Sequence, residues 1–410
     1  MQSDQRSLKL LNCKMKFFKL FREFAVSNSL GGLLLISSVM IALIVANSPL
    51  GESYAHFLTL KFGFDGAGLN LRYSLLSWIN DGLMAVFFLM VALEIKRELV
   101  KGELSSVKKA TLPILAALGG VAAPALIYTL LNQGTPTAIG WGIPMATDMA
   151  FALPVVILLG KRVPASLKVF LAALAIADDL CAILVIALFY STELHTIYLA
   201  YAGGIVALLV VFNWLGVKPL TFYLIPGLVM WYFIHHSGIH ATIAGVLTAL
   251  TLPATQNDSE SPLERLEHAL SKPVNFIIIP LFALANTNIR FESGMVDGLT
   301  TTMGLGIMLG LLVGKPLGIS LFSWAAVKTG LGSLPTGARW SHLIGVGILG
   351  GIGFTMSIFI ALLSFPDQVA VSSAAKFAVL TASLLSALVG YVFLRTFGQN
   401  DVFWVGRNDK

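Results

Sequence analysis

Two adjacent carboxylates, Asp178 and Asp179, interrupt the apolar segment that covers residues 166–190. A charged side chain at the centre of a membrane helix costs about 2.5 to 3.5 kcal/mol on insertion scales, so an adjacent pair needs a compensating role. Ionisable residues at such depth generally mark an ion or proton pathway. We therefore take this pair as the centre of a candidate ion site.

Two further ionisable residues, Asp148 and Lys315, lie deep in apolar segments. Lys315 can pair with an aspartate when the site carries protons, or it can offset both the converging helix dipoles and the charge of Asp148. The sequence leaves both roles open. Other ionisable residues lie nearer the ends of their segments: Asp81, Glu94 and His240.

The chemistry expected of Asp178 and Asp179 is competition between a cation and protons. Consecutive residues point about 100° apart around a helix, so one carboxylate can face a cavity while the other faces a cation. Two neighbouring buried carboxylates cannot both ionise cheaply, so protons are retained until a cation arrives. Oxygen ligands suit hard cations such as Na⁺ and Li⁺, and the Thr147 hydroxyl can add one more.

The composition identifies a polytopic membrane protein. The chain has 410 residues, of which 56% are hydrophobic and 12% charged, with a mean hydropathy of +0.83. Repeated apolar runs predict membrane helices, because lipid forces each backbone polar group to be satisfied within its helix. The net charge of +6 follows the membrane topology, so nucleic acid is not an expected partner. Cys13 and Cys181 show no spacing typical of zinc or redox sites, and no cofactor is expected.

The predicted fold class is an all-α polytopic membrane protein with twelve transmembrane helices. Residues 1–29 form an amphipathic cytoplasmic segment, residues 30–397 the twelve-helix domain, and residues 398–410 a cytoplasmic tail. The twelve spans cover residues 30–47, 75–95, 109–131, 135–159, 166–190, 196–215, 219–235, 239–252, 273–288, 299–324, 340–364 and 370–396.

A small β-hairpin is predicted between the first two spans. Residues 58–73 form two alternating stretches, Leu58–Phe62 and Leu69–Tyr73, around Asp65-Gly66-Ala67-Gly68. Its open edge could pair with a second copy of the chain. Most of the 27 Lys and Arg residues fall on one side of the membrane, which places both termini in the cytoplasm.

The fourth and eleventh spans contain helix-breaking residues at mid-membrane depth. Gly142 and Pro144 lie in the fourth span, and Gly351 and Gly353 in the eleventh. Irregular backbone at this depth is tolerated where it lines a cavity. We therefore predict two discontinuous helices beside the carboxylates.

Together these motifs resemble those of NhaA-type sodium/proton antiporters, with spacing preserved from about residue 28 to 396. The family is one of the established examples of inverted-repeat transporters, so the resemblance implies repeats over spans 3–5 and 10–12 whose broken helices cross. The segments that carry the resemblance are Thr147-Asp148, Ala177-Asp178-Asp179, Gly314-Lys315-Pro316-Leu317-Gly318, Leu93-Glu94-Ile95-Lys96-Arg97-Glu98 and Gly351-Ile352-Gly353-Phe354-Thr355-Met356-Ser357.

The resemblance also implies an activity and a setting. It implies electrogenic exchange of two protons inward for one Na⁺ or Li⁺ outward, activated as the cytoplasmic pH rises. The setting would be the bacterial inner membrane. The protein would be a homodimer that uses the hairpin of residues 58–73.

The resemblance implies roles for individual residues. Asp179 would be the main cation ligand, Asp178 a partner ligand and proton site, and Thr147 and Asp148 would lie at the broken crossing beside Lys315. Residues implied in the cytoplasmic mouth and the pH response are Glu94, Arg97, Glu98, Glu267 and His268, with His240 as a further candidate.

Ordinary structural roles compete with these assignments near the helix ends. Glu94, Arg97 and Glu98 have the i, i+3, i+4 spacing of a solvated charge cluster. A histidine titrates in the right range, but a satisfied structural histidine is the favoured interpretation of His240. The chain also departs from the family at Glu264, where known members carry a basic residue, and at Ser271, where they carry a histidine. We expect a different midpoint or steepness of pH regulation.

Three other function classes fit less well. An intramembrane aspartyl protease needs a GxGD motif, which precedes neither Asp148 nor the Asp178-Asp179 pair. A sodium-coupled organic anion symporter of similar fold needs a larger cavity and co-directional movement of cation and substrate. A passive channel lacks a pore repeat or charged ring. The sequence therefore predicts a transporter and not an enzyme.

Overall fold

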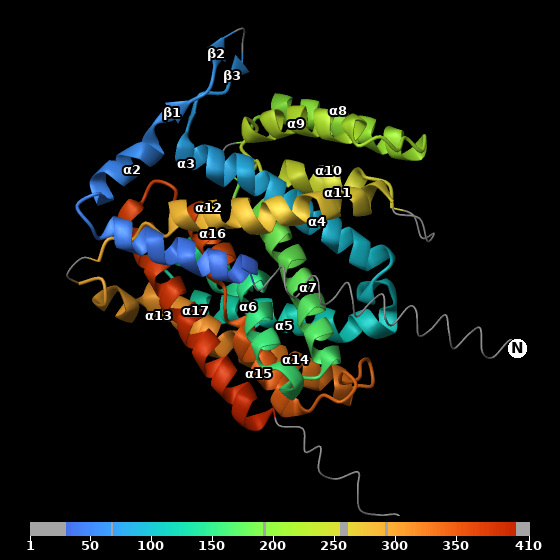
Figure 1. Ribbon diagram of the computed structural model, residues 1–410, viewed down its shortest axis with the longest axis vertical. Coiled ribbons are helices and arrows are strands. Elements are labelled where there is room, and N and C mark those ends of the chain that lie inside the picture. Colours follow the sequence, from blue (N-terminus) through green and yellow to red (C-terminus); the bar gives the residue numbers. More distant parts are fainter. Residues whose placement is uncertain (1–29, 67–68, 192–193, 255–260, 292–293, 399–410) are drawn as a thin grey trace, which may run out of the picture.

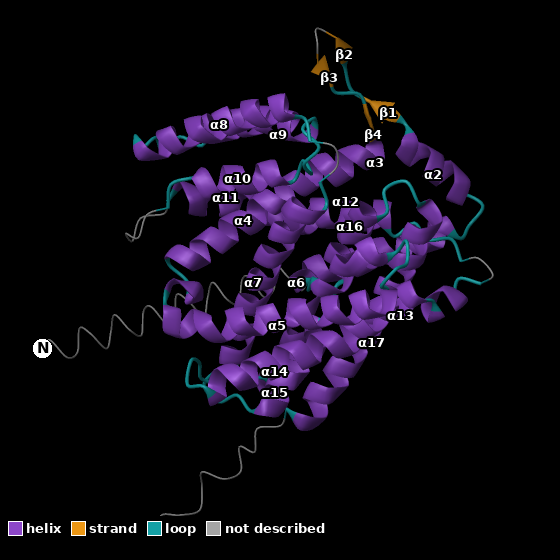
Figure 2. Cartoon of the chain, turned by 180° about the vertical axis from the view of Figure 1, so that it is seen from behind, coloured by secondary structure: helices purple, strands orange, loops and turns teal. Residues whose placement is uncertain are grey.

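The computed structural model describes residues 30–66, 69–191, 194–254, 261–291 and 294–398, and these are mostly helical (Figure 1, Figure 2). The predicted amphipathic segment of residues 1–29 and nearly all of the predicted tail, residues 399–410, lie outside them.

The elements follow one another along the chain with short connections. The first helix, Leu30–Ala46, bends by 111° into α2, Gly51–Thr59. Up to residue 189 there follow α3 (Leu75–Ser77), the π-helical η1 (Trp78–Leu83), α4 (Met84–Val100), the 3-10 helix η2 (Glu103–Ser105), α5 (Val107–Asn132), the 3-10 helix η3 (Ala138–Met145), α6 (Met149–Leu158), the 3-10 helix η4 (Gly160–Arg162) and α7 (Ala165–Phe189).

The second half begins with three apolar helices. The elements are α8 (Thr196–Trp214), α9 (Thr221–His235), α10 (Ile243–Thr251), α11 (Pro262–Pro273), the π-helical η5 (Val274–Ile278), α12 (Ile279–Asn286), the 3-10 helix η6 (Asp297–Thr300), α13 (Thr302–Leu309), the π-helical η7 (Gly310–Gly314), α14 (Lys315–Lys328), α15 (Trp340–Gly350), α16 (Phe354–Ser364) and α17 (Val369–Phe397).

The helices confirm a polytopic membrane protein. Within the described residues, eight helical spans are long and apolar enough to cross a membrane, or ten if each of two bent pairs is one span. The second bent pair is α15 with α16, at 43°. Helices α9 and α10, at the predicted seventh and eighth spans, have only 15 and 9 residues, fewer than the roughly 20 that a bilayer core requires.

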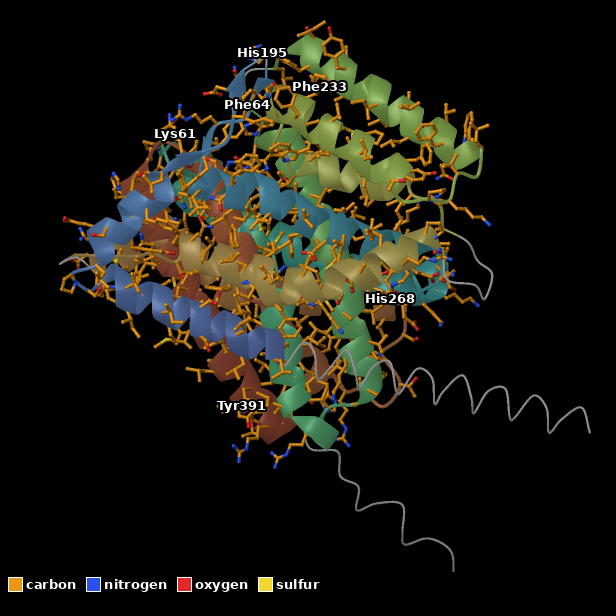
Figure 3. All side chains as sticks on the ribbon, turned by 45° about the horizontal axis from the view of Figure 1, so that its top comes forward. Lys61, Phe64, His195, Phe233, His268 and Tyr391 are labelled. Carbon is orange, nitrogen blue, oxygen red and sulfur yellow. The ribbon has the colours of Figure 1, made fainter. Side chains whose placement is uncertain are left out.

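The hairpin is present, but its first strand was predicted too early. Strand β1 (Lys61–Phe62) pairs antiparallel with β4 (Tyr73–Ser74), and β2 (Asp65–Gly66) with β3 (Leu69–Asn70). Leu58 and Thr59 belong to α2, because Leu58 is buried against the helices and this packing overrides the local alternation. Asp65 and Gly66 form β2, although the turn was predicted to begin there. The hairpin projects from the helical body, with Lys61 and Phe64 on its surface (Figure 3).

Aromatic residues anchor the hairpin to the end of α9. The Tyr73 ring packs edge-on against His235 with centroids 4.7 Å apart, and the Asn70 backbone N–H donates to Tyr232 Oη over 3.4 Å. Burial, followed by the charges of neighbouring groups including Tyr232, raises the pKa of Tyr73. The Tyr73 hydroxyl therefore stays protonated and donates to the Asn70 carbonyl over 2.7 Å.

Helix α7 lies between two groups of helices (Figure 1). On one side α8 packs on α9, and α9 packs on α10, which packs on α4. On the other side α5 packs on α14, and α15 on α17. Because α7 contacts both α4 and α5, the carboxylates at its middle lie where the two groups meet.

Two of the three π-helical segments precede a proline. Pro280 follows η5 and Pro316 follows η7. A proline ring clashes with the carbonyl four residues earlier, which in each case lies inside the π-helical segment. The widened turn accommodates the ring, and such turns are frequent at functional sites. Lys315 directly follows η7, and Asn275 lies within η5.

Candidate functional site

The two carboxylates of α7 are buried and face different surroundings, as their spacing predicted. Asp178 is 1% exposed, and its Oδ2 accepts hydrogen bonds from Lys315 Nζ and Thr147 Oγ1, both at 2.6 Å. Asp179 is 8% exposed and lines a cavity. Asp178 therefore lies against a cation, and Asp179 lies where an ion can enter.

The Lys315 side chain contacts both an aspartate and a helix end. Its fully buried ammonium donates both to Asp178 Oδ2 and to the Met145 carbonyl oxygen, at the last residue of η3. The carbonyl end of a helix carries a partial negative charge. The ammonium thus neutralises a carboxylate and also offsets a helix end.

The two predicted breaks lie against each other. One separates η3 from α6 around Thr147, and the other separates α15 from α16 around Ile352. The Asp148 backbone N–H donates to the Ile352 carbonyl over 2.6 Å. Thr147 Oγ1 lies 2.9 Å from the Gly350 carbonyl oxygen, so its one proton is shared between that carbonyl and Asp178 Oδ2. Backbone groups freed by one break are therefore satisfied by the other, as apolar surroundings require.

The helix-breaking residues are also positions of close approach. A Cβ at Gly142 would lie 2.7 Å from Tyr190 Oη, and one at Gly353 would lie 3.1 Å from the Ala146 carbonyl across the break. A larger residue at Gly142 would press on Tyr190 at the end of α7, and one at Gly353 would push the two breaks apart. The other two predicted positions, Pro144 and Gly351, face η7.

Asp148 joins the two breaks through the N-terminus of α6. Its Oδ1 accepts from the Ala150 N–H over 3.0 Å, and its Oδ2 accepts from the N–H and the hydroxyl of Thr355. Capping and the helix dipole both favour a carboxylate here. Sequence analysis missed Thr355 as a site residue. The sequence feature that could have indicated Thr355 is its hydroxyl directly after the second break, since Thr147 provides a hydroxyl in the first break.

A cavity of about 80 Å³ lies beside Asp179. A single water needs roughly 10–15 Å³ of such volume, so the cavity accommodates several waters or an ion with part of its shell. Asp179 Oδ1 is buried and has no hydrogen-bond partner among the described residues, so it offers a free ligand. The polar side chains that line the cavity are Glu94, Thr147, Asp148, Asp179, Asn275 and Thr355.

Comparison with known sequences identifies the family of this chain. The profile of the family described as Na⁺/H⁺ antiporter 1 matches residues 22–394. The chain belongs to the Na⁺/H⁺ antiporter 1 family. It is 63% identical over 388 residues to Na⁺/H⁺ antiporter NhaA 2 of Flavobacterium johnsoniae, covering 94% of this chain and 95% of the relative. It is 51% identical to NhaA of Bordetella parapertussis (93% and 98% covered) and 50% identical to NhaA of Dechloromonas aromatica (96% and 100%).

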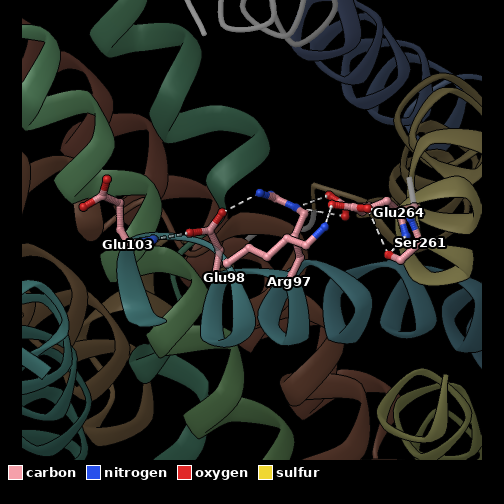
Figure 4. Close-up of polar contacts among 7 residues, drawn as sticks. Arg97, Glu98, Glu103, Ser261 and Glu264 are labelled. Carbon is pink, nitrogen blue, oxygen red and sulfur yellow. Dashed lines mark hydrogen bonds and ion pairs between the residues drawn. The ribbon is translucent and has the colours of Figure 1, made fainter. Parts of the chain in front are cut away.

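In this member of the Na⁺/H⁺ antiporter 1 family, α4 and α11 are joined by ion pairs (Figure 4). Arg97 Nε donates to both carboxylate oxygens of Glu267, at 3.0 and 2.9 Å, and Arg97 Nη1 donates to Glu98 Oε1 over 2.6 Å. Lys101 Nζ contacts Glu264 Oε1 at 2.8 Å. The side chains of Arg97, Glu98 and Glu267 are only 31%, 14% and 13% exposed, so they do not form a fully solvated cluster.

The remaining three family positions lie in three different places. Glu94 lines the cavity with Asp179, whereas His268 lies on α11 (Figure 3). His240 lies outside the cavity: its Nε2 is 3.4 Å from Asp81 Oδ1, and its Nδ1 is 2.9 Å from Thr242 Oγ1. Both ring nitrogens have partners, which fits the structural interpretation, and a role in pH response stays a prediction.

Proposed function

We propose that this chain exchanges Na⁺ or Li⁺ for H⁺ across the membrane, with cation and protons competing for Asp178 and Asp179. The observation that carries the proposal is the partnerless Oδ1 of Asp179, in a small cavity beside the Asp178–Lys315 pair. The relatives named as Na⁺/H⁺ antiporters support the same activity. No cofactor is required, since Na⁺, Li⁺ and H⁺ are the transported species.

The geometry supplies a route to two protons for each cation. In the described arrangement Lys315 neutralises Asp178, which corresponds to the proton-loaded state with a proton on Asp179. A cation that enters the cavity replaces the proton of Asp179. It gains Asp178 Oδ2 as a second ligand only when Lys315 withdraws, and Lys315 releases a proton as its ion pair breaks. One cation then replaces two protons, which makes the exchange electrogenic.

The size of the cavity favours an inorganic ion. Pockets that hold drug-sized ligands occupy about 300–1,000 Å³. The cavity beside Asp179 measures about 80 Å³, which suits an alkali cation with a few waters. A second cavity, of about 570 Å³, has the size that the alternative of a sodium-coupled organic anion symporter requires. Its lining is almost entirely apolar and contains no charged side chain, so it offers an organic anion no partner.

The full transporter architecture is part of the same proposal. Twelve spans would form inverted repeats over spans 3–5 and 10–12, with the broken fourth and eleventh helices crossing at the site. The contacts between the breaks around Thr147 and Ile352 support this arrangement. The distribution of Lys and Arg supports a bacterial inner-membrane protein with both termini in the cytoplasm.

The deciding experiment is the collapse of a pH gradient in everted membrane vesicles. Cells that lack their own sodium/proton exchangers would express the native chain, and respiration would establish the gradient. Addition of NaCl or LiCl should collapse it, increasingly so as the pH rises, and choline chloride should not. No response to either cation at any pH would overturn the proposed function.

Glu264 is expected to shift the pH dependence of exchange. Its carboxylate forms an ion pair with Lys101. Together with Ser261, it also forms the capping box of α11. Glu264→Lys combined with Ser271→His would restore the residue types of known family members. It would also place two cations together and remove the carboxylate half of the capping box, while the Ser261 hydroxyl would still cap the helix. We expect the pH of half-maximal exchange in vesicles to move relative to the native chain.

The matched control is Glu264→Gln, because glutamine retains the capping box while it removes the charge. It should move the pH profile in the same direction, but less. An unchanged profile in the double variant Glu264→Lys/Ser271→His would show that these departures do not tune regulation.

We further propose that the hairpin mediates a homodimer. Phe64 at its surface is 63% exposed, and short strands with open edges can pair with another copy. Phe62 and Tyr73 are directly paired, so residues 63–72 can be replaced by a two-residue Asn-Gly turn without moving the helices. This variant should elute as a monomer in mild detergent where the native chain elutes as a dimer. A dimer that persists would contradict the proposed role, and unchanged thermal unfolding would show that the fold is intact.

A further inference from the structure

Asn275 is a polar residue of the cavity that the exchange proposed at Asp179 does not use. It lies in the π-helical η5, and it lines the same cavity as Asp179. Its side-chain amide makes no hydrogen bond with any residue in the described part of the chain. A polar group without a partner in a partly closed, largely apolar space is unfavourable. The position therefore calls for water or a ligand.

Glu94 is the second such residue, and it comes from a different helix. Its carboxylate forms no ion pair within the described ranges, although Arg97 lies one turn away. Arg97 is occupied by Glu98 and Glu267. Four residues of α4, at the i, i+3, i+4, i+7 spacing of one helix face, line the cavity: Phe87, Met90, Val91 and Glu94.

Asn275 and Glu94 flank the cavity on the side of the ion-pair cluster. Glu94 precedes Arg97 by one turn of α4, and Asn275 follows directly after α11, the two helices that the cluster joins. Helix α4 packs against both α11 and η5. The other polar lining residues, by contrast, come from α7 and the two breaks. The cavity thus has two polar ends, one at the broken helices and one beside the cluster.

A third polar group of the cavity also lacks a partner among the described residues, and it supports a cation as the occupant. Asp179 is more than nine-tenths buried, and its Oδ1 lacks a hydrogen bond in the described structure. By contrast, the other polar lining residues have hydrogen-bond partners: Thr147 contacts Asp178 and the Gly350 carbonyl, and Asp148 pairs with Thr355. The oxygens left available are therefore those of two carboxylates and one amide. Carboxylate and amide oxygens are the ligands that hard cations prefer.

We propose that Asn275 and Glu94 form an entry subsite, where an alkali cation exchanges part of its water for one amide oxygen and one carboxylate oxygen before it reaches Asp179. This inference rests on the proposed antiport function and adds a step to it. The volume of about 80 Å³ leaves room for the waters that the cation keeps. When the cation loses its hydration shell in two stages, one large dehydration barrier is replaced by two smaller ones.

The test is the effect of Asn275 on the kinetics of Na⁺-dependent exchange in vesicles. Asn275→Ala, and Asn275→Leu, which keeps the branching of the side chain but removes its polar atoms, should lower kcat/KM for Na⁺ by about three- to tenfold, the range expected for one lost ligand. The value of kcat should stay within about twofold, since Asp179 is untouched. Asn275→Asp should restore kcat/KM, because it returns an oxygen ligand. Ile277→Ala changes an exposed residue of the same π-helical segment and should change nothing.

A calorimetric titration of the purified chain with Li⁺ separates an entry subsite from a ligand of the main site. The equilibrium affinity of the Asn275→Ala variant should stay within about twofold of native, because the cation leaves Asn275 before it binds Asp179. A parallel loss of Li⁺ affinity would place Asn275 in the main site and overturn the proposal. An unchanged kcat/KM for Na⁺ in the Asn275→Ala variant would also overturn the proposal. A fall in its kcat that accompanies a fall in its unfolding temperature would do the same. Absence of exchange by the native chain would instead overturn the proposed function.

Discussion

Replacement of Asp179 by Asn should abolish Na⁺- and Li⁺-dependent collapse of the pH gradient at every pH. The amide offers no negative charge, so the cation loses the ligand whose Oδ1 lies free in the cavity. The fold should be unaffected or slightly stabilised, because the substitution removes one of two adjacent buried acids. Asp178→Asn should also abolish exchange, but it leaves Lys315 buried without its counter-ion and should lower the unfolding temperature.

A surface carboxylate serves as the control. Glu52 is exposed and forms only a long ion pair with Arg290, at 3.5 Å. Glu52→Gln should therefore keep the native exchange activity and the native unfolding temperature. Purified variants would be compared by exchange in vesicles and by thermal unfolding in detergent. An Asp179→Asn variant that exchanges Na⁺ at the native rate would refute the assignment of the site.

Lys315→Met is expected to be the most destabilising single change. It removes the cation from beside Asp178 while keeping a side chain of similar length, so a buried carboxylate is left unpaired. Removal of one partner from a buried pair typically costs about 3–5 kcal/mol. If Lys315 carries one of the two protons, the exchange that remains should also become insensitive to membrane potential, which can be measured with a potassium diffusion potential in proteoliposomes.

A double-mutant cycle identifies the pair as the cause. Asp178→Asn combined with Lys315→Met removes both charges and should recover much of the stability that the lysine variant loses. Equal destabilisation in the single and double variants would mean that Lys315 acts through the Met145 carbonyl instead. Voltage-dependent exchange in Lys315→Met would show that Lys315 is structural and carries no transported proton.

The site was largely predictable because charge inside a membrane is rare. Four charged residues stand out in the sequence because their neighbours are apolar: Asp148, Asp178, Asp179 and Lys315. Glycine and proline residues indicate the positions of the breaks from the sequence alone. Their pairing was not predictable. The acceptors of Lys315 and Thr147 include the carbonyls of Met145 and Gly350, and every residue has a carbonyl, so sequence cannot indicate which ones face a site.

The errors in the fold arose where packing overrode local pattern. Leu58 fits the alternation of a strand, but its burial draws it into α2. The π-helical segments left no clear signal beyond the prolines that follow η5 and η7. Asn275 was overlooked for a related reason: a neutral amide in a helix is unremarkable until the structure shows that nothing binds it.

The hydrogen bonds between the two breaks have a mechanical consequence. The Thr147 hydroxyl lies within hydrogen-bond distance of both an oxygen of Asp178 and the Gly350 carbonyl. Asp148 accepts from Thr355, and its own N–H donates to Ile352. The groups that form the candidate site are therefore the same groups that fasten four half-helices to one another. If the site is to face the opposite side of the membrane, this unit must travel as one stiff piece, and the helices around α4 must provide the sliding surface.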